Sequence, residues 1–392
     1  MFPDHGHRRI VVASPDDIAT ARRIAAERAG GVLDSGDAAR LDRVVTAAAR
    51  HALGRPDGTL LIARMRNGAG VECLAYDRDP TTVDPSVPPG ADAARDGVPA
   101  AAAHAAAHAS GCALDAVREE ADRFHFHITP GIGSALLARI LRPEADDAAP
   151  PDALAQTGAV MVERSGGGAA RGGPFIDHWS VGCAPARGGD GPCGIALMID
   201  GDIAREDEAK ADGDPPPPVT IMTPEVVRQV ETVVAATVPG LPAPVVVNAI
   251  RRDLTGRPEL RLSHGQPLTR IGRSAVAVLR FDAEAVDYTA LGTLAGAVVR
   301  PQEITALGAR WAMIGFNPLA PASVHLRWAP GDHVVLYTDG CDRLPALFLR
   351  RDLHEVEPTL AALVLLRDGA VRDDDHCIVI LRNRADRLPA AG

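Results

Sequence analysis

The segment Gly331–Gly340, with the sequence GDHVVLYTDG, decides how we interpret the C-terminal half of this chain. Its middle residues, HVVLYT, are mostly β-branched or aromatic and predict a buried strand, and Asp339-Gly340 is a strong turn signal directly after them. A carboxylate at the end of a buried strand is held in place by the sheet behind it. The segment therefore predicts that Asp339 lies fixed at the edge of a sheet.

Three more aspartates lie in comparable settings, each beside a hydrophobic run that is typical of a strand. They are Asp177 in PFIDHWSVG, Asp200 in GIALMIDG and Asp374 in RDDDHCIVILR. One such aspartate alone is more often a turn former or a cap, but four in one domain favour a shared metal site. Carboxylates are hard oxygen ligands that suit Mg²⁺ or Mn²⁺. A pair of these ions can bind phosphate and activate a water, so the pattern indicates metal-assisted phosphoester hydrolysis.

Composition narrows the class of protein. The chain has 392 residues and 46% hydrophobic content, enough for two domains with real cores. A formal net charge of −10, with Lys210 as the only lysine, argues against a nucleic-acid-binding protein. Six cysteines without metal-site or disulfide-framework spacing fit a reducing cytoplasm. The first residues lack a signal-peptide pattern and no apolar run is long enough to span a bilayer, so we expect a soluble cytoplasmic protein without a membrane partner.

We expect two domains, residues 1–164 and 174–392, joined by the glycine-rich linker 165–173. The first should contain helices over 18–29 and 38–53, a strand pair TLLIARMR and VECLAYDR, and a closing strand near TGAVMVER. The second should contain a helix over 224–236, several antiparallel strands, a helix over 358–367 and the final strand CIVILR. Many strands with few helices predict a layered α+β fold.

Residues 175–382 resemble the SpoIIE-type metal-dependent serine/threonine phosphatases, particularly the short stress-response phosphatases of bacterial partner-switching systems. The family's motifs have counterparts in chain order: Ile176-Asp177-His178-Trp179, Asp200-Gly201, Leu291-Gly292-Thr293, Thr338-Asp339-Gly340 and Asp374-Asp375-His376-Cys377. The resemblance implies an α-β-β-α sandwich that binds two Mn²⁺ or Mg²⁺ ions. It implies hydrolysis of phosphoserine or phosphothreonine on a signalling protein, an anti-anti-sigma-type regulator. It assigns the catalytic and metal-ligand roles to Asp177, Asp200, Asp339 and Asp374, with the Gly201 carbonyl as a further ligand.

The chain departs from the family pattern at three motifs. The family's DGxGHG continues here as DGDIARED, the central GN lacks its asparagine, and DDxT ends in Cys377. The alternative is a non-catalytic pseudo-kinase and pseudo-phosphatase that binds a sigma-regulatory partner. Retention of all four aspartates favours the enzyme.

The N-terminal half resembles, more weakly, the GHKL ATP-binding fold of anti-sigma-factor serine kinases, an α/β sandwich. Asp77 matches the adenine-reading aspartate, and Gly131 to Gly133 partly match a later glycine motif, where a turn into a helix could bind phosphate or be a plain turn. The helix that carries the family's Mg²⁺-binding asparagine and catalytic glutamate reads Ala47–Ala52, AAARHA. We therefore expect no ATP cofactor, and a degenerate domain kept for protein recognition or regulation.

Overall fold

The structure is a computed structural model. It describes residues 6–82, 113–142, 154–162, 177–184, 192–200, 224–237, 240–256, 275–292, 294–308, 323–338, 341, 343–371 and 375–384. The alanine-rich segment 100–109 and the linker 165–173 lie outside these residues. No helix in the described part of the chain is long and apolar enough to cross a membrane.

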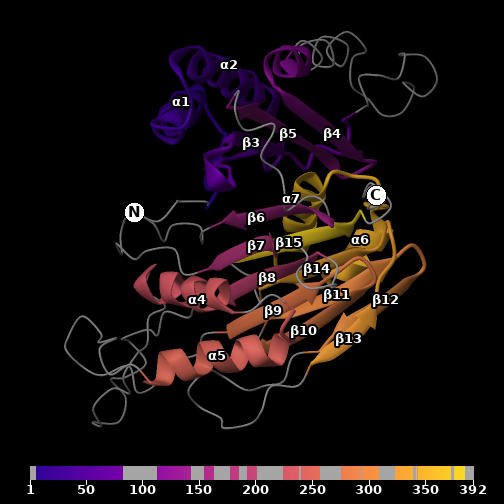
Figure 1. Cartoon of the computed structure of the whole chain (residues 1–392). Coiled ribbons are helices and arrows are strands. Elements are labelled where there is room, and N and C mark those ends of the chain that lie inside the picture. Colours follow the sequence, from indigo (N-terminus) through magenta and orange to yellow (C-terminus); the bar gives the residue numbers. More distant parts are fainter. Residues whose placement is uncertain are drawn as a thin grey trace, which may run out of the picture. The chain divides into compact units, whose positions relative to one another are not determined.

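The chain divides into two compact units (Figure 1). Unit 1 contains Met1–Ala149 together with Glu355–Asp368, and unit 2 contains Pro150–His354 together with Gly369–Gly392. This division differs from the expected one. The strand near TGAVMVER lies in unit 2, and a helical segment from the C-terminal half lies in unit 1.

Unit 1 is built on one antiparallel sheet with the strand order β1-β2-β3-β5-β4. The strands are β1 (Arg8–Val11), β2 (Thr59–Arg64), β3 (Gly70–Tyr76), β4 (Arg123–Thr129) and β5 (Gly133–Leu141). Helices α1 (Pro15–Ala29) and α2 (Ser35–Ala52) cover one face, with the single turn η1 (Arg66–Gly68) between β2 and β3. The α2 helix begins where the Asp34 side chain accepts a hydrogen bond from the Asp37 amide, and aspartate is a preferred residue at this capping position.

The opposite face of this sheet meets α7 (Pro358–Gly369). In β3, Val71, Cys73 and Ala75 belong to the core shared with α1 and α2, so Glu72 between them points to the other side. Arg139 of β5 lies beside Glu72 and hydrogen-bonds to residues at the start of α7. Unit 1 is therefore a sheet between two helical layers, and one of those layers is far away in the sequence (Figure 1).

Unit 2 is a sandwich of two five-stranded antiparallel sheets, with the strand orders β13-β10-β9-β8-β7 and β12-β11-β14-β15-β6. The first contains β7 (His178–Ala184), β8 (Cys193–Asp200), β9 (Ala275–Phe281), β10 (Ala285–Leu291) and β13 (Val324–Arg327). The second contains β6 (Ala155–Val162), β11 (Ala295–Arg300), β12 (Glu303–Leu307), β14 (His333–Tyr337) and β15 (His376–Asn383). Alternate residues of both sheets share one hydrophobic core, which includes Met198, Leu279, Tyr288, Leu336 and Val379.

The helices of unit 2 lie on the outside of the two sheets. α4 (Pro224–Ala236) packs on α5 (Ala243–Gly256), and α5 contacts β9 and β10. α6 (Leu344–Arg350) contacts β11 and β14 of the other sheet. This layered arrangement confirms the predicted α+β class and the expected sandwich in the C-terminal half, and α4 occupies the predicted residues 224–236.

Two local predictions were wrong. The stretch GIGSALLARIL forms strand β5 after a hairpin turn, and not a helix, because it is a central strand buried on both faces. The strand near TGAVMVER, β6, does not complete the N-terminal sheet. It pairs along its whole length with β15, from Ala155 opposite Asn383 to Val162 opposite His376.

Candidate functional site

Two of the predicted ligands, Asp177 and Asp200, lie at the same end of one strand pair. β7 and β8 are antiparallel, with His178 opposite Ile199. Continuing this register by one residue places Asp177 directly opposite Asp200, the last residue of β8. Side chains at such positions have Cβ atoms about 4.5–5.5 Å apart, and like charges there repel. Asp177 is buried, with 4% of its surface exposed, which raises the cost of this repulsion.

The other two aspartates are adjacent in sequence to a second, interlocked pair of strand ends. The Thr338 amide donates to the Cys377 carbonyl at 3.1 Å, and the Cys377 amide donates to the Thr338 Oγ1 at 3.0 Å. Asp339 directly follows Thr338, and Asp374 precedes Cys377 by three residues. Asp339, Asp374 and Gly201 themselves lie outside the described residues.

Cys377 connects these two strand ends. Its thiol is fully buried, and burial, followed by the charges of Asp177 and Asp200 and the neighbouring Cys341, raises its pKa well above the ordinary value. Both carboxylates of the first sheet therefore lie within electrostatic reach of the residue that pairs with Thr338 in the second sheet. The motif segments of the two sheets converge at one end of the sandwich.

The donors at this end fit a hard divalent cation. Within the described residues, which include only two of the five predicted ligands, no group of three or more His, Cys, Asp or Glu side chains is arranged to hold a metal. The two carboxylates that are described oppose each other across a strand pair, an arrangement that a bound cation relieves. Their oxygens are ligands of the kind that Mg²⁺ and Mn²⁺ prefer.

Asp77 of unit 1 lies in a different environment. Its Oδ1 accepts hydrogen bonds from the amides of Asp79 at 3.0 Å and Ser134 at 3.1 Å. Its Oδ2 accepts from the Ser134 hydroxyl at 2.5 Å and from Arg55 Nη1 at 3.3 Å. Only 1% of the Asp77 surface is exposed. Both carboxylate oxygens are therefore occupied by the protein's own donors.

His51 completes this closed centre. Its Nε2 lies 3.3 Å from the Ser134 Oγ and 3.7 Å from the Asp77 Oδ2. Burial, and then the charge of Arg55, lowers the pKa of His51 to about 4, so the ring is neutral near pH 7. A serine, a histidine and an aspartate meet here, but the Ser134 hydroxyl is buried and donates to the carboxylate, so it is not placed to attack a substrate.

The glycines predicted to contact a nucleotide have a structural explanation. Gly131, at φ +72°, lies in the tight turn between β4 and β5, and Gly133 starts β5. A Cβ on Gly133 would lie 2.1 Å from the Asp77 carbonyl oxygen, so only glycine lets the two backbones approach. No helix follows this turn, so the phosphate site at a helix N-terminus that the sequence suggested is not formed.

The residues around Asp77 consequently do not fit a purine nucleotide. The Asp77 carboxylate, which would bind the base, already accepts hydrogen bonds from Ser134. The matching segment of α2 has alanines where the family has its metal-binding asparagine. His51, Arg55 and Ser134 were missed by sequence reasoning as partners of Asp77. The one sequence feature that could have indicated this cluster is Ser134, a polar residue directly after the glycine motif.

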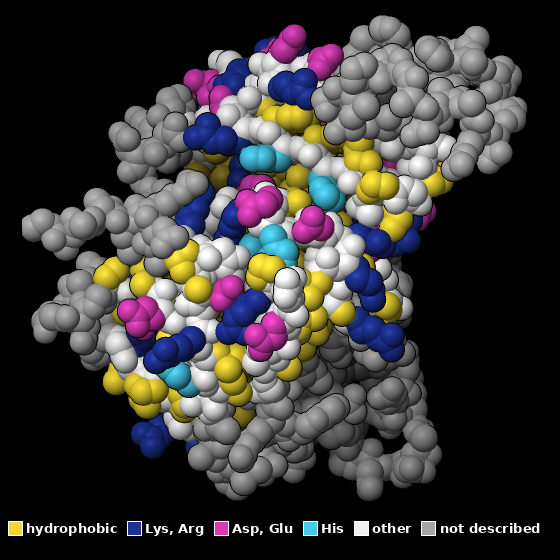
Figure 2. All heavy atoms as spheres, turned by 90° about the vertical axis from the view of Figure 1, so that its right-hand side faces the viewer, with side chains coloured by type: hydrophobic (Ala, Val, Ile, Leu, Met, Phe, Trp, Pro, Cys, Tyr) yellow, Lys and Arg dark blue, Asp and Glu magenta, His cyan; other side chains and the backbone are white. Residues whose placement is uncertain are grey.

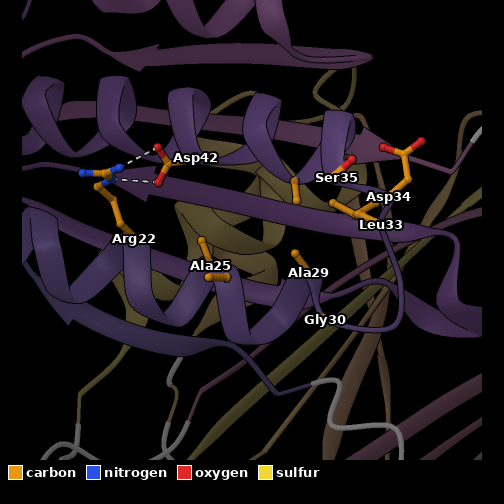
Figure 3. A pocket seen from close by; sticks show the side chains of 10 residues that line it. Arg22, Ala25, Ala29, Gly30, Leu33, Asp34, Ser35 and Asp42 are labelled. Carbon is orange, nitrogen blue, oxygen red and sulfur yellow. Dashed lines mark hydrogen bonds and ion pairs between the residues drawn. The ribbon is translucent and has the colours of Figure 1, made fainter.

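A shallow pocket of about 220 Å³ lies between α1 and α2 (Figure 3). Four of its ten lining residues are alanines, and at one end Arg22 pairs with both carboxylate oxygens of Asp42, at 2.7 and 2.8 Å. None of the predicted site residues lines it. On the face in Figure 2, some of the described arginine side chains lie beside acidic ones, and others follow one another down the right-hand edge.

No protein-family model and no curated protein matches the chain. Similar solved structures include the PP2C phosphatase domain of Bacillus subtilis SpoIIE with a fragment of its regulatory domain (13% identity, TM-score 0.38, covering 94% of this chain and 98% of that one). RsbX in complex with magnesium has 11% identity and a TM-score of 0.41 over 59% of this chain and 96% of its own. The catalytic domain of PstP with two manganese ions has 12% identity and a TM-score of 0.39 over 58% and 98%.

The SpoIIE neighbour is a PP2C phosphatase domain, and PstP is a serine/threonine protein phosphatase.

Proposed function

We propose that unit 2 is a metal-dependent phosphatase that hydrolyses phosphoserine or phosphothreonine on a bacterial signalling protein. The observation that carries the proposal is the opposition of Asp177 and Asp200, next to the strand ends from which Asp339 and Asp374 continue. Four carboxylates at one end of a sandwich are tolerable when divalent cations lie between them. Two Mn²⁺ or Mg²⁺ ions, when bound, would supply a nucleophile at neutral pH and stabilise the charge on the transferred phosphoryl group.

The chain's own residues provide the frame for this chemistry. From the first sheet, Asp177, Asp200 and the Gly201 carbonyl would hold the cations. Asp339 and Asp374 would hold them from the second sheet. The paired bonds between Thr338 and Cys377 join the ends of β14 and β15, so the strand ends from which Asp339 and Asp374 continue would keep a constant separation. The Cys377 thiol stays protonated because its pKa is raised, so it would serve as packing and not as a nucleophile.

The test is hydrolysis of p-nitrophenyl phosphate and of a phosphoserine peptide by the full chain, with and without Mn²⁺. Asp200→Asn and Asp177→Asn should each lower the Mn²⁺-dependent kcat/KM by about 100-fold or more, the scale of several kcal/mol of lost charge stabilisation. Asp282→Asn is the matched control, because Asp282 caps the turn between β9 and β10 and has no predicted ligand role.

Wild-type chain that neither binds Mn²⁺ nor hydrolyses either substrate would contradict the proposal and favour the non-catalytic binding protein. For the physiological substrate, the family resemblance favours an anti-anti-sigma-type regulator in its phosphorylated form. Incubation of such regulators with the full chain and Mn²⁺, followed by mass spectrometry, would identify the one that loses its phosphate.

Unit 1 would have a regulatory or protein-recognition role and no kinase activity. This proposal is supported by the filled carboxylate of Asp77 and by Ala47 and Ala48 at the matching segment of α2. A titration of the full chain with a fluorescent ATP analogue and Mg²⁺ should show no saturable binding at micromolar concentrations. Saturable, Mg²⁺-dependent binding that Asp77→Asn abolishes would instead support a nucleotide site.

A further inference from the structure

Strand β7, which begins directly after Asp177, is the last strand in the order of the first sheet of unit 2. Among the described strands it pairs with β8 alone, along its length from His178 to Ala184. A strand that is paired on one side separates from its sheet more easily than an inner strand. Asp177 and Asp200 oppose each other at this end, and the repulsion between their carboxylates acts to push the edge strand away.

The residue next to Asp177 faces the helices of unit 2. Trp179 and Val181 of β7 pack against the core of the sandwich. Because successive side chains of a strand point to opposite faces, Asp177 lies on the core side with them and His178 points to the outer face. That face of the sheet carries α4 and α5 (Figure 1). The start of β7 therefore contacts the helical layer through His178.

This contact is a hydrogen bond to the middle of α4. His178 Nε2 lies 3.0 Å from the Glu231 Oε1. An ionised carboxylate only accepts hydrogen bonds, so the His178 ring donates from Nε2. The His178 side chain is 12% exposed and the Glu231 side chain 36%. The bond is therefore partly shielded from water, and it joins the first residue of the edge strand to a helix.

The helix that carries Glu231 is itself connected to the middle of the sheet. Gln229 of α4 donates to the Asp253 Oδ2 of α5 at 2.7 Å. α5 contacts the inner strands β9 and β10, and the amide of Ala243 at its start donates to the Asp287 Oδ2 of β10 at 2.7 Å. The two helices therefore link the inner strands to the edge strand, and they end at the residue beside Asp177.

We propose that His178 and Glu231 are positioning residues for the metal site: by joining the edge strand to the helical layer, they hold Asp177 opposite Asp200 against the repulsion between the two carboxylates. The inference rests on the proposed phosphatase function, and it assigns a role to two side chains that do not touch the cation. A site that is already assembled binds a cation more tightly, because binding does not have to supply the free energy of assembly.

The first test is the Mn²⁺ affinity of the full chain with Glu231→Ala, measured by electron paramagnetic resonance. We expect the dissociation constant to rise about twofold to fivefold, the range for the loss of a partly exposed pair. Glu231→Gln keeps a side-chain oxygen that accepts the hydrogen bond from His178, so it should recover most of the affinity.

Glu303→Ala is the matched control. Glu303 lies on β12, the edge strand of the other sheet, and pairs with Arg300 at 3.4 Å. The substitution therefore removes a paired glutamate at an edge strand that does not carry Asp177 or Asp200. It should leave the Mn²⁺ affinity unchanged.

The second test needs no metal. Hydrogen exchange in a peptide that covers residues 177–184 should become faster in Glu231→Ala, because the end of β7 opens more often. In the Asp200→Asn background the same substitution should accelerate exchange much less, because the repulsion that the contact resists has been removed. A contact that only stabilises the fold would give the same acceleration in both backgrounds.

Equal acceleration in both backgrounds, or unchanged exchange in Glu231→Ala, would overturn the proposal. Unchanged Mn²⁺ affinity in Glu231→Ala, where the wild type binds the ion, would contradict it as well. If the wild-type chain binds no Mn²⁺, the phosphatase proposal fails, and the exchange measurements without metal still decide whether His178 and Glu231 hold Asp177 in place.

Discussion

The carboxylate of Asp77 and the opposed carboxylates of Asp177 and Asp200 differ in how their charge is balanced. Asp77 in unit 1 receives two amides, a hydroxyl and an arginine, so the protein itself satisfies both oxygens. Asp177 and Asp200 in unit 2 lie opposite each other at the end of a strand pair, where each adds to the charge that the other must tolerate. The first arrangement is closed and stabilises the fold. Under the proposed function, a divalent cation would bind at the second arrangement, and this difference separates a structural aspartate from a candidate ligand.

The largest expected effect comes from breaking the closed centre. Asp77→Ala leaves the buried Ser134 hydroxyl without its acceptor and removes one carboxylate partner of Arg55, and it should lower the free energy of unfolding of unit 1 by about 3–5 kcal/mol. Chemical denaturation of the full chain, followed by hydrogen exchange of unit 1 peptides, measures this loss. A variant as stable as the wild type would show that Asp77 is not held by the contacts described.

The closed centre should also make unit 1 sensitive to acid. The pKa of His51 is lowered to about 4 in the folded protein, against an ordinary value near 6.5, so the unfolded chain binds the proton first. Its contribution to stability is intact above pH 6.5 and should be lost progressively between about pH 6.5 and 4, by up to about 3 kcal/mol.

The free energy of unfolding of the wild type and of His51→Gln, measured as a function of pH, tests this contribution. The variant should lose less stability than the wild type between about pH 6.5 and 4. His333 of β14, with a pKa lowered to about 3 mainly by burial and then by the charges of His354 and Arg382, should add a slope of the same sign. Parallel profiles for the two proteins would contradict the assignment to His51.

The smallest expected effect is a gain in stability when the repulsion between Asp177 and Asp200 is removed. Without added metal, Asp200→Asn removes one of two opposed charges, and should raise the free energy of unfolding of unit 2 by about 0.2–1 kcal/mol. The same variant should abolish the increase in Tm that Mn²⁺ gives the wild type. Destabilisation in the absence of metal would mean that Asp200, like Asp77, is a structural carboxylate.

The sequence could predict those parts of the fold whose signals are local. Thr223 as a cap and Pro224 in the first turn predict the helix over 224–236, and hydrophobic runs predict the strands around Asp200 and before Asp339. The strand Gly133–Leu141 was missed because alanine, leucine and arginine favour helices, and a strand buried on both faces shows no alternation.

The pairings that join distant segments could not be predicted. Nothing in the residues of Ala155–Val162 indicates that their partner is the last strand, more than 200 positions later. The same holds for Arg139 and Thr359, and for the meeting of His51, Asp77 and Ser134. For the candidate site, the sequence predicted the aspartates, whereas the opposition of Asp177 and Asp200 follows only from the strand register.

The late position of two structural elements has a consequence for biosynthesis. Unit 1 lacks one helical layer until residues 355–368 have left the ribosome, and β6 lacks its neighbour until residues 376–383 have followed. Neither unit can therefore reach its final form before these late residues emerge. Nascent chains would expose β6 and one face of the N-terminal sheet until then, and both units should mature nearly together afterwards.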